Sequence, residues 1–397
     1  MRVLQVFKTY YPDSFGGVEQ VIRQIATSSA AYGVTCKVFA PSPAAADVRT
    51  VQEDGVDVIQ VPCTIEIAST PFAIRALGPF REAAAWADVI HYHFPWPFGD
   101  LLHLLGQPRK PAVVTYHSDI VRQKALLQLY KPLQRKFLDS MRAIVATSPN
   151  YAETSETLQR HKDKVSVIPI GVNESAYPRP DPARVAAWRD RVGEGFFLFI
   201  GVIRYYKGLH ILLDALGPAV ASTTRNVRVV IVGSGPVEND LRRQALALKL
   251  DNVEFLGAVS EEDKMALLQL CLAVVFPSHL RSEAYGITLV EGAMSGKPLI
   301  SAELGTGSSF VNIDGRTGLV VPPRDPQALR QAMDRLVSHP EEVARMGREA
   351  RVRFEAVFTA DRMTSAYADL YQRVCDKAQC SHVAGASTMV EAHVPRD

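Results

Sequence analysis

Two series of short apolar runs, each interleaved with longer amphipathic stretches, restrict the fold of this chain more than any other feature. Short apolar runs bounded by turn residues are typical of buried strands, and the amphipathic stretches between them are typical of helices that connect parallel strands. The sequence therefore predicts parallel sheets covered by helices on both faces. The expected strands of the first series are residues 3–7, 35–40, 56–61, 89–93, 112–116, 143–147 and 165–168, and those of the second are 196–200, 228–232, 253–255, 273–276, 298–301 and 318–320.

A linker separates the two series, because Pro178, Pro180 and Pro182 interrupt regular structure there. The 397 residues suffice for two domains, since a domain takes about 150 residues. We predict two doubly wound, Rossmann-like α/β domains that face each other across a cleft, the N-terminal one at 1–175 and the C-terminal one at 176–360. Beyond them we expect a helix at 361–375. A disordered tail is expected at 376–397, where the residues are small and polar without a period.

The overall composition excludes several classes of protein. The 44 lysines and arginines nearly balance the 42 aspartates and glutamates, so there is no global field for nucleic acid and no nucleic-acid partner is expected. No apolar run approaches the ~20 residues of a membrane-spanning helix, and the first residues lack a signal-peptide core. The five cysteines show no C-x-x-C spacing, which indicates a cytoplasmic protein without a zinc knuckle or a disulfide framework.

The common motifs of α/β enzymes are incomplete in this chain. The G-S-G at 233–235 lacks the third glycine of a dinucleotide-binding loop, where Glu238 stands. A Gly-Lys pair that could belong to a P-loop is followed by Pro298 instead of Ser or Thr. His91 and His93 share a strand face, but without further ligands nearby they favour a structural or substrate-packing role. We therefore expect no metal site.

Polar residues and glycines follow several of the predicted strands. Gly16 and Gly17 precede a helix and would let backbone amides approach an anion, although such a pair is more often a tight turn. His117 ends a buried strand and could donate to a sugar hydroxyl or an ester oxygen; the alternative is a hydrogen-bonded loop histidine. Arg204 and Lys207 would clamp a diphosphate, because both stay charged and arginine can bind bidentately.

The most specific pattern is E-x-Y-G-x4-E at residues 283–291, where a strand gives way to a helix. Glu283 lies in the loop and Glu291 in the helix, and Gly286 permits the sharp turn between them. The first carboxylate can then reach a sugar ring, while the second accepts hydrogen bonds from paired ribose hydroxyls.

Together these residues resemble the retaining glycosyltransferases of family 4, which have the GT-B fold. The resemblance runs from G-G-V-E at 16–19 through Y-K-G at 206–208 and the paired glutamates to 317–321. It is closest to bacterial mannosyl- and rhamnosyltransferases of surface-polysaccharide (O-antigen) assembly, on residues 202–209 and 305–312. The resemblance implies a hexosyltransferase whose donor is a nucleotide-diphosphate sugar, with GDP-mannose or GDP-rhamnose favoured.

The family also implies roles for individual residues. Glu283 would hold the transferred sugar near its C3 and C4 hydroxyls, and Glu291 would hold the ribose. By similarity, the donor-binding residues would be Gly16, Gly17, Arg204, Lys207, Glu283, Gly286, Ile287, Thr288 and Glu291, and the catalytic ones Glu283, His117, Lys207 and Arg204. Backbone at 255–259 would border the base, and the helix at 361–375 would cross back onto the first domain.

The sequence departs from the family at two places. Val202 stands directly after the glycine where the family has arginine, and Arg204 comes two residues later. The loop at 305–309 carries no glutamate, so phosphate contacts there would come from backbone and hydroxyl groups. Two alternatives to a glycosyltransferase stay open: a nucleotide-sugar epimerase of the same fold, and a non-catalytic sugar-nucleotide-binding protein.

The reaction implied by the family proceeds on one face of the sugar, where the departing diphosphate oxygen takes the acceptor proton. No metal is then needed if cations and N–H groups absorb the charge, so we expect no cofactor.

Residues 119–143 bear on the acceptor. Cations and apolar residues interleave there, as in a helix lying on an anionic membrane surface, although half of the apolar face could instead belong to the core. A lipid-linked saccharide acceptor would account for such a surface, with the protein peripheral on the inner face of the cytoplasmic membrane. The cations are Arg122, Lys124, Lys131, Arg135, Lys136 and Arg142.

Overall fold

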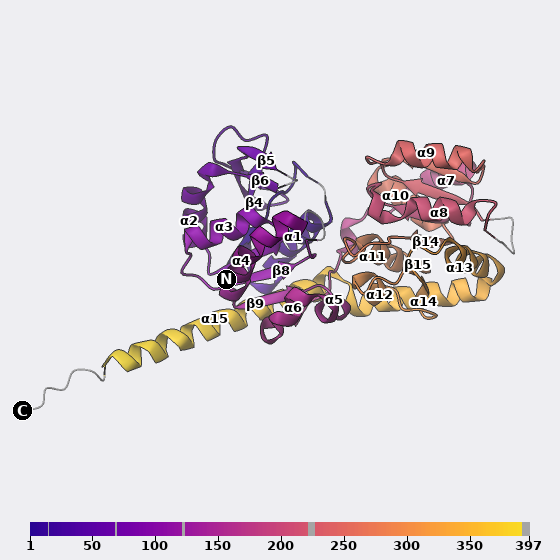
Figure 1. Cartoon of the computed structure of the whole chain (residues 1–397). Coiled ribbons are helices and arrows are strands. Elements are labelled where there is room, and N and C mark those ends of the chain that lie inside the picture. Colours follow the sequence, from indigo (N-terminus) through magenta and orange to yellow (C-terminus); the bar gives the residue numbers. More distant parts are fainter. Residues whose placement is uncertain (15, 68–69, 121–123, 221–226, 391–397) are drawn as a thin grey trace, which may run out of the picture. The chain divides into compact units, whose positions relative to one another are not determined.

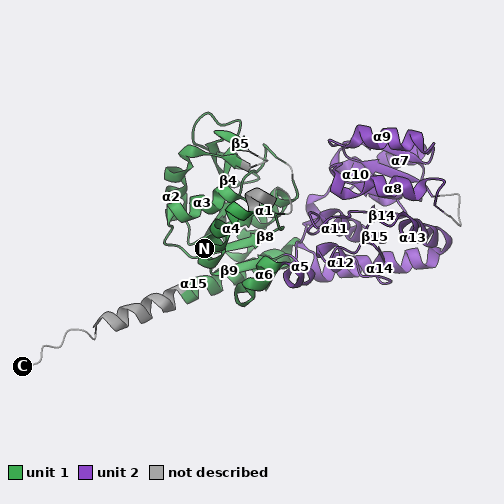
Figure 2. Cartoon of the chain, viewed as in Figure 1, with its two compact units in different colours: residues 1–146, 156–168, 360–397 green, residues 147–155, 169–359 purple. Residues whose placement is uncertain are grey.

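The computed structural model describes residues 1–14, 16–67, 70–120, 124–220 and 227–390, and Figure 1 traces its helices and strands. The chain forms two compact units, which Figure 2 colours separately. Unit 1 comprises Met1–Ala146, Glu156–Ile168 and Ala360–Asp397, and unit 2 comprises Thr147–Ser155 and Pro169–Thr359. Each unit contains its own sheet of mainly parallel strands connected by helices, so the prediction of two Rossmann-like α/β domains is confirmed.

The sheet of unit 1 has the order β10-β9-β8-β7-β1-β2-β4-β3. Its pairs are parallel except β3 with β4, which are antiparallel. β3 was not predicted, because this edge strand is mostly exposed and has no apolar run. The strands are β1 (Arg2–Val6), β2 (Thr35–Ser42), β3 (Arg49–Glu53), β4 (Val56–Pro62), β7 (Val89–Phe94), β8 (Ala112–Tyr116), β9 (Ala143–Ala146) and β10 (Val165–Val167), and a separate hairpin pairs β5 (Ile65–Ile67) with β6 (Thr70–Phe72).

The helices of unit 1 include one from the far end of the chain. They are α1 (Gly17–Ser28), α2 (Leu77–Trp86), α3 (Pro97–Gly106), α4 (Lys124–Ser140), α6 (Glu156–Arg160) and α15 (Ala360–Val390). α15 packs against α1 and buries Met363, Tyr367, Leu370 and Tyr371 in unit 1. It continues to Val390, whereas we expected a disordered tail from residue 376. No proline interrupts this stretch. Residues 391–397 lie outside the described residues.

The sheet of unit 2 is wholly parallel, in the order β13-β12-β11-β14-β15-β16. Its strands are β11 (Phe197–Ile200), β12 (Val229–Val232), β13 (Val253–Gly257), β14 (Ala273–Phe276), β15 (Leu299–Ala302) and β16 (Gly318–Val321). Its helices are α5 (Pro149–Thr154), α7 (Pro182–Val192), α8 (Leu209–Leu216), α9 (Glu238–Ala247), α10 (Glu261–Leu270), α11 (Ile287–Met294), α12 (Gly307–Val311), α13 (Pro326–Ser338) and α14 (Pro340–Val357).

The strand order of unit 2 reverses between β11 and β14. From β11 the chain winds outward through β12 to β13, and from β14 it winds the other way through β15 to β16. Loops that leave two such neighbours diverge, which opens a crevice at the carboxyl ends of the strands. Phe197, Phe199 and Leu212 belong to the buried cluster that anchors this part of the sheet. Lys207 follows β11 and Glu283 follows β14, so both predicted site residues lie at the reversal.

The boundary between the units differs from the predicted one at residue 175. Residues from Pro169 onward already belong to unit 2, because Val172 pairs with Thr359 in a backbone bridge. Thr147–Ser155 also belongs to unit 2. There Thr154 Oγ1 donates to the carbonyl oxygen of Gly305 at 2.6 Å. Within the described ranges, no helix combines the length and the apolar character needed to cross a membrane.

Candidate active site

Lys207 and Glu283 form a nearly buried ion pair at the point where the strand order of unit 2 reverses. Lys207 Nζ donates to Glu283 Oε2 at 2.5 Å, and the two side chains are 13% and 10% exposed. Ser278 Oγ donates to the same oxygen at 3.3 Å. The structure thus joins two of the predicted site residues, which come from separate loops.

Gly208 fixes the loop that carries Lys207. Its φ is +74°, and a Cβ at this position would lie 1.9 Å from the carbonyl oxygen of Pro277. The same two loops are joined by His279 N, which donates to Tyr206 O at 3.0 Å. Only a residue without a side chain fits this close approach. The position of Lys207 next to the β14 loop therefore depends on this glycine.

Gly286 turns the chain into α11. Its φ is +90°, and a Cβ there would lie 3.0 Å from the ring of Phe276. α11 begins at Ile287, and Thr288 Oγ1 donates to Ile200 O, at the end of β11, at 3.2 Å. The first backbone amides of a helix have no partner within it and favour an anion. The start of α11 can thus bind a phosphate beside the Lys207 loop.

Glu291 is buried in α11 and is held by two side chains that sequence reasoning did not identify. Its Oε1 accepts from Lys264 Nζ at 2.9 Å and from Tyr177 OH at 3.0 Å. Lys264 also pairs with Glu261 at 2.6 Å. Burial opposes the charge of Lys264, but the two carboxylates outweigh it and raise the pKa of its amine. Lys264 and Tyr177 therefore keep the carboxyl group of Glu291 in place.

Arg204 and the G-S-G segment lie on the same side of the sheet of unit 2. Arg204 is exposed, and its carbonyl accepts from Lys207 N at 3.0 Å. A Cβ on Gly233 would lie 2.1 Å from Gly201 O, and one on Gly235 would lie 2.1 Å from Ile203 O. These glycines let the β11 and β12 loops touch. This packing accounts for the G-S-G without a dinucleotide. Beside it, Gly257 O, in the segment predicted to border the base, accepts from Gly233 N at 2.7 Å.

In unit 1, Gly16 caps α1 and a carboxylate from the helix itself lies against it. A Cβ on Gly16 would lie 2.4 Å from Glu19 Oε2. Glu19 is buried and accepts from Thr9 Oγ1 at 2.6 Å and from Ser14 Oγ at 2.7 Å. Gly17 is the first residue of α1. The turn thus places its own negative group beside the helix start, where an anion was expected.

His117 lies directly after β8 and is 7% exposed. Its backbone N donates to Phe94 O at 3.0 Å, and its Nε2 lies 2.9 Å from His93 Nδ1. Burial lowers the pKa of the imidazole to about 3, so His117 is neutral at physiological pH. His91 and His93 are likewise hydrogen-bonded within unit 1. Among the described residues, no group of three or more His, Cys, Asp and Glu side chains could hold a metal ion.

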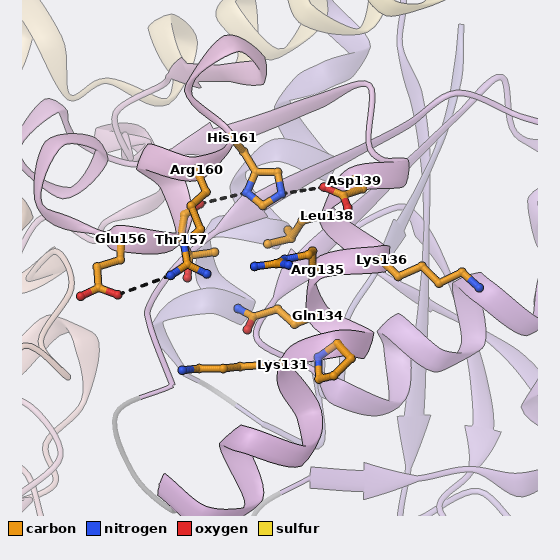
Figure 3. A pocket seen from close by; sticks show the side chains of 11 residues that line it. Lys131, Gln134, Arg135, Lys136, Leu138, Asp139, Glu156, Thr157, Arg160 and His161 are labelled. Atoms are coloured by element: carbon orange, nitrogen blue, oxygen red, sulfur yellow. Dashed lines mark hydrogen bonds and ion pairs between the residues drawn. The ribbon is translucent and has the colours of Figure 1, made fainter.

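The basic segment predicted at 119–143 contains α4. Phe137 and Leu138 are buried, so part of its apolar face belongs to the core. A pocket of about 430 Å³ lies between the second half of α4 and α6. Figure 3 shows Lys131 and Arg135 on the side of α4 that faces this pocket, with Lys136 directed the other way. Arg122 and the side chain of Lys124 lie outside the described residues.

Each half of the chain matches a known family of protein sequences. Residues 15–176 match the family described as "Glycosyltransferase Family 4", and residues 185–353 match "Glycosyl transferases group 1". The D-rhamnosyltransferase WbpZ of Pseudomonas aeruginosa is 52% identical over 364 residues, which cover 91% of this chain and 93% of the relative. The O-antigen chain mannosyltransferase C of Escherichia coli is 52% identical over 371 residues, which cover 94% of this chain and 98% of the relative.

Solved structures of glycosyltransferases share the fold at low sequence identity. Sucrose-phosphate synthase from Thermosynechococcus elongatus aligns with a TM-score of 0.75 at 20% identity, over 94% of this chain and 98% of that one. Anabaena HepE, solved with UDP and glucose, aligns with a TM-score of 0.73 at 18% identity, over 94% of this chain and all of that one. With both halves matched and two relatives at 52% identity, the chain belongs to the family 4 glycosyltransferases and has the GT-B fold.

Proposed function

We propose that this enzyme transfers mannose or rhamnose from a GDP-linked donor to a saccharide acceptor in the synthesis of an O-antigen-type surface polysaccharide. The observation that carries the proposal is the Lys207–Glu283 pair. It places a cation suited to a diphosphate beside a carboxylate suited to sugar hydroxyls. The choice of sugar is supported by the names of the two relatives that are 52% identical.

In the proposed single-step transfer with retention, the acceptor oxygen attacks the face that the diphosphate leaves. The bond from the anomeric carbon to the diphosphate oxygen breaks, the bond to the acceptor oxygen forms, and the acceptor proton passes to the departing diphosphate. Lys207 and the first amides of α11, at Ile287 and Thr288, would bind the negative charge that develops. These groups supply positive potential without a metal or another cofactor. Arg204 is exposed and would add a second cation when the donor is bound.

The remaining predicted residues would orient the two substrates. Glu291, held by Lys264 and Tyr177, would accept hydrogen bonds from the ribose hydroxyls of the donor. Within unit 1, Gly16, Gly17 and His117 are the residues that we predict to bind substrate. Each of these roles depends on a polar group with fixed orientation, which lowers the entropy lost on reaching the reactive geometry.

The decisive experiment incubates the purified chain with GDP-mannose or GDP-rhamnose and a synthetic lipid-linked saccharide. We expect free GDP and an extended saccharide, with the anomeric configuration of the donor as determined by NMR. An inverted product would overturn retention. An altered but free nucleotide sugar would identify an epimerase. A donor that raises the melting temperature yet stays unchanged would identify a non-catalytic binding protein.

We also propose that the basic segment at 119–143 contacts an anionic membrane surface that carries the acceptor. The support is the pocket between α4 and α6, which Lys131, Arg135 and Arg160 line. Arg160 pairs with Glu156 at 4.0 Å, and His161 pairs with Asp139 at 3.0 Å, as Figure 3 shows. Lipid phosphates would meet exposed cations over an apolar helix face here.

Vesicle sedimentation tests this contact. The wild-type chain should sediment with phosphatidylglycerol vesicles at low salt and not with phosphatidylcholine vesicles. A Lys131→Glu, Arg135→Glu variant should bind less. The control changes the same charge elsewhere, with Arg243→Glu and Lys249→Glu in unit 2, and should bind as the wild type does. Failure of the wild type to sediment, or an equal loss in the control, would refute the membrane contact.

A further inference from the structure

A series of buried hydrogen bonds connects His117 with the last helix of the chain, wholly inside unit 1. His117 Nε2 lies 2.9 Å from His93 Nδ1, and His93 Nε2 lies 2.8 Å from Gln5 Oε1. Gln5 Nε2 donates to the hydroxyl of Tyr371 on α15 at 3.3 Å. Tyr371 OH in turn lies 2.8 Å from His91 Nδ1. The start of the loop after β8, strands β7 and β1, and helix α15 are thus joined through the side chains of His117, His93, His91, Gln5 and Tyr371.

The carboxamide of Gln5 gives this series a direction. Its carbonyl oxygen can only accept, so His93 Nε2 must carry the proton and donate. A neutral imidazole has one protonated nitrogen, so His93 Nδ1 must accept from His117 Nε2. His117 then carries its proton on Nε2, and its Nδ1 has a free electron pair. Burial lowers the pKa of both imidazoles well below neutrality, which is consistent with their neutral forms.

In the structure, the hydroxyl of Tyr371 accepts from the carboxamide in the orientation that this direction requires. If the amide turned over, its NH2 group would donate to His93 Nε2, and every bond as far as His117 would reverse. Its carbonyl would then face Tyr371, whose hydroxyl would have to donate to it and accept from a protonated His91 Nδ1. In the observed orientation the hydroxyl accepts from Gln5 Nε2 and is free to donate to His91 Nδ1. The other partner of Gln5 Nε2 is the weak acceptor Cys36 Sγ, at 3.9 Å.

We propose that Gln5 and Tyr371 are positioning residues that fix His117 in the Nε2–H tautomer, so that Nδ1 accepts a hydrogen bond from a hydroxyl of the substrate. The sequence alone predicted that His117 donates to the substrate, whereas the proposed tautomer makes its Nδ1 an acceptor. The inference rests on the proposed function only in taking His117 as a residue that contacts a sugar hydroxyl. The tautomer itself is a property of unit 1 and is measurable without any substrate.

The experiment is 15N NMR of the full chain labelled at histidine, with the His117 signals assigned from a His117→Asn variant. Protonated and unprotonated ring nitrogens of a neutral imidazole resonate in separate regions. The wild type should show Nε2 protonated and Nδ1 unprotonated in His117. Tyr371→Phe should give a mixture of the two tautomers, because the carboxamide loses the acceptor that orients it.

A matched control comes from the same helix. Tyr367 is also buried on α15, and its hydroxyl bonds at 2.7 Å to Thr115 Oγ1, which lies 2.7 Å from His91 Nε2 on the side away from Tyr371. Tyr367→Phe removes the same atom and should leave the His117 tautomer unchanged. Protonated Nδ1 in the wild type, or an unchanged His117 spectrum in Tyr371→Phe, would overturn the proposal. If the spectra agree but the enzyme transfers no sugar, the proposed function fails and the tautomer assignment stands.

Discussion

Lys207 and Glu283 neutralise each other in the structure, and this pairing bears on how a donor would enter. A diphosphate that attracts Lys207 would weaken the hold of the amine on Glu283 and leave the carboxylate to accept from sugar hydroxyls. The two parts of the donor would then be bound together, since each releases a group that the other needs. A sugar or a nucleotide alone would satisfy half of the pair.

The first prediction concerns the amine. Lys207→Ala should lower kcat by ~10²–10³, because an electrostatic stabiliser of the leaving diphosphate is lost. It should also lower the free energy of unfolding by about 3 kcal/mol, since Glu283 remains buried without its partner. Steady-state kinetics at a temperature where the variant is folded, checked by circular dichroism, separate the two effects. Arg204→Ala, at an exposed position, should lose less. Near-normal turnover in Lys207→Ala would contradict the diphosphate role.

The second prediction concerns the support of Glu291. Lys264→Met should raise the KM for the donor more than it lowers kcat, because Glu291 loses the cation that holds its carboxylate. Glu261→Gln removes the other partner of Lys264 and should leave KM nearly unchanged. Because the pKa of Lys264 is raised above that of an ordinary lysine, its amine stays charged at neutral pH. The charge is lost only when the pH rises through this raised pKa. Donor affinity should therefore not change with this group near neutrality. An unchanged KM in Lys264→Met would show that Glu291 needs no such support.

Among single residues, the candidate site residues that stand in a local sequence motif could be predicted from the sequence. Those that stand in no such motif could not. Glu283 and Glu291 stand in one motif, and Lys207 stands between strand and helix next to a glycine. Lys264 lies on α10 and Tyr177 lies in the segment before α7, and the sequence around neither residue has a motif that would identify it. The same holds for Tyr371, whose bond to Gln5 spans nearly the whole chain.

At the level of elements, the loop after β11 depends on one close approach. Gly208→Ala should unfold at lower temperature than the wild type and lose activity, because a Cβ would collide with Pro277 O and displace Lys207. Gly315 is the matched control, since its φ is +68° but a Cβ there would meet nothing within 4 Å. Gly315→Ala should lower the free energy of unfolding by about 1 kcal/mol, from the left-handed conformation alone, and keep kcat. Equal effects in both variants would refute the steric argument.

The contact of α3 with α4 gives a pH-dependent prediction. His103 on α3 lies 2.9 Å from Tyr92 OH and 3.0 Å from Ser140 Oγ, and burial lowers its pKa to about 4. Below about pH 6.5 the unfolded chain binds a proton at this histidine and the folded chain does not. The free energy of unfolding should thus fall as the pH drops from 6.5 toward 4, by up to about 1.4 kcal/mol per pH unit from this group.

His103→Gln can still hydrogen-bond but cannot titrate, so its dependence on pH should be shallower. Urea unfolding at several pH values between 7 and 4.5 measures the two slopes. Identical slopes would show that His103 does not titrate as its burial implies.

Most elements were predictable because parallel strands are buried on both faces and therefore consist of uninterrupted Val, Ile, Leu and Phe. β11 and β12 are such strands, and all four residues of each are apolar and buried. β3 was not predicted because the side chains of an exposed edge strand need not be apolar. The far half of α15 was taken for a tail because its residues lack the apolar period that marks a packed helix.

On the scale of the whole molecule, unit 1 is assembled from segments at both ends of the chain. A chain that ends at Lys377 keeps Tyr367, Leu370 and Tyr371, and should melt as the full-length protein does. A chain that ends at Thr364 should lose the cooperative unfolding of unit 1, because these side chains are buried in it. Calorimetry of the two truncations compares them directly. If the shorter chain melted like the longer one, α15 would not be part of the folded core.

The packing of α15 on α1 also has a consequence for synthesis. Ribosomes make the chain from its N-terminus, so the strands of unit 1 emerge early, while the helix that contacts Gln5 and His91 emerges only after unit 2. All segments of unit 2 have been synthesised once the chain reaches Thr359, so unit 2 can fold first. Until α15 has been synthesised, part of the polar interior of the nascent N-terminal sheet stays uncovered. A chain terminated before Ala360 would therefore contain a folded unit 2 and an incomplete unit 1, which chaperones and proteases can bind.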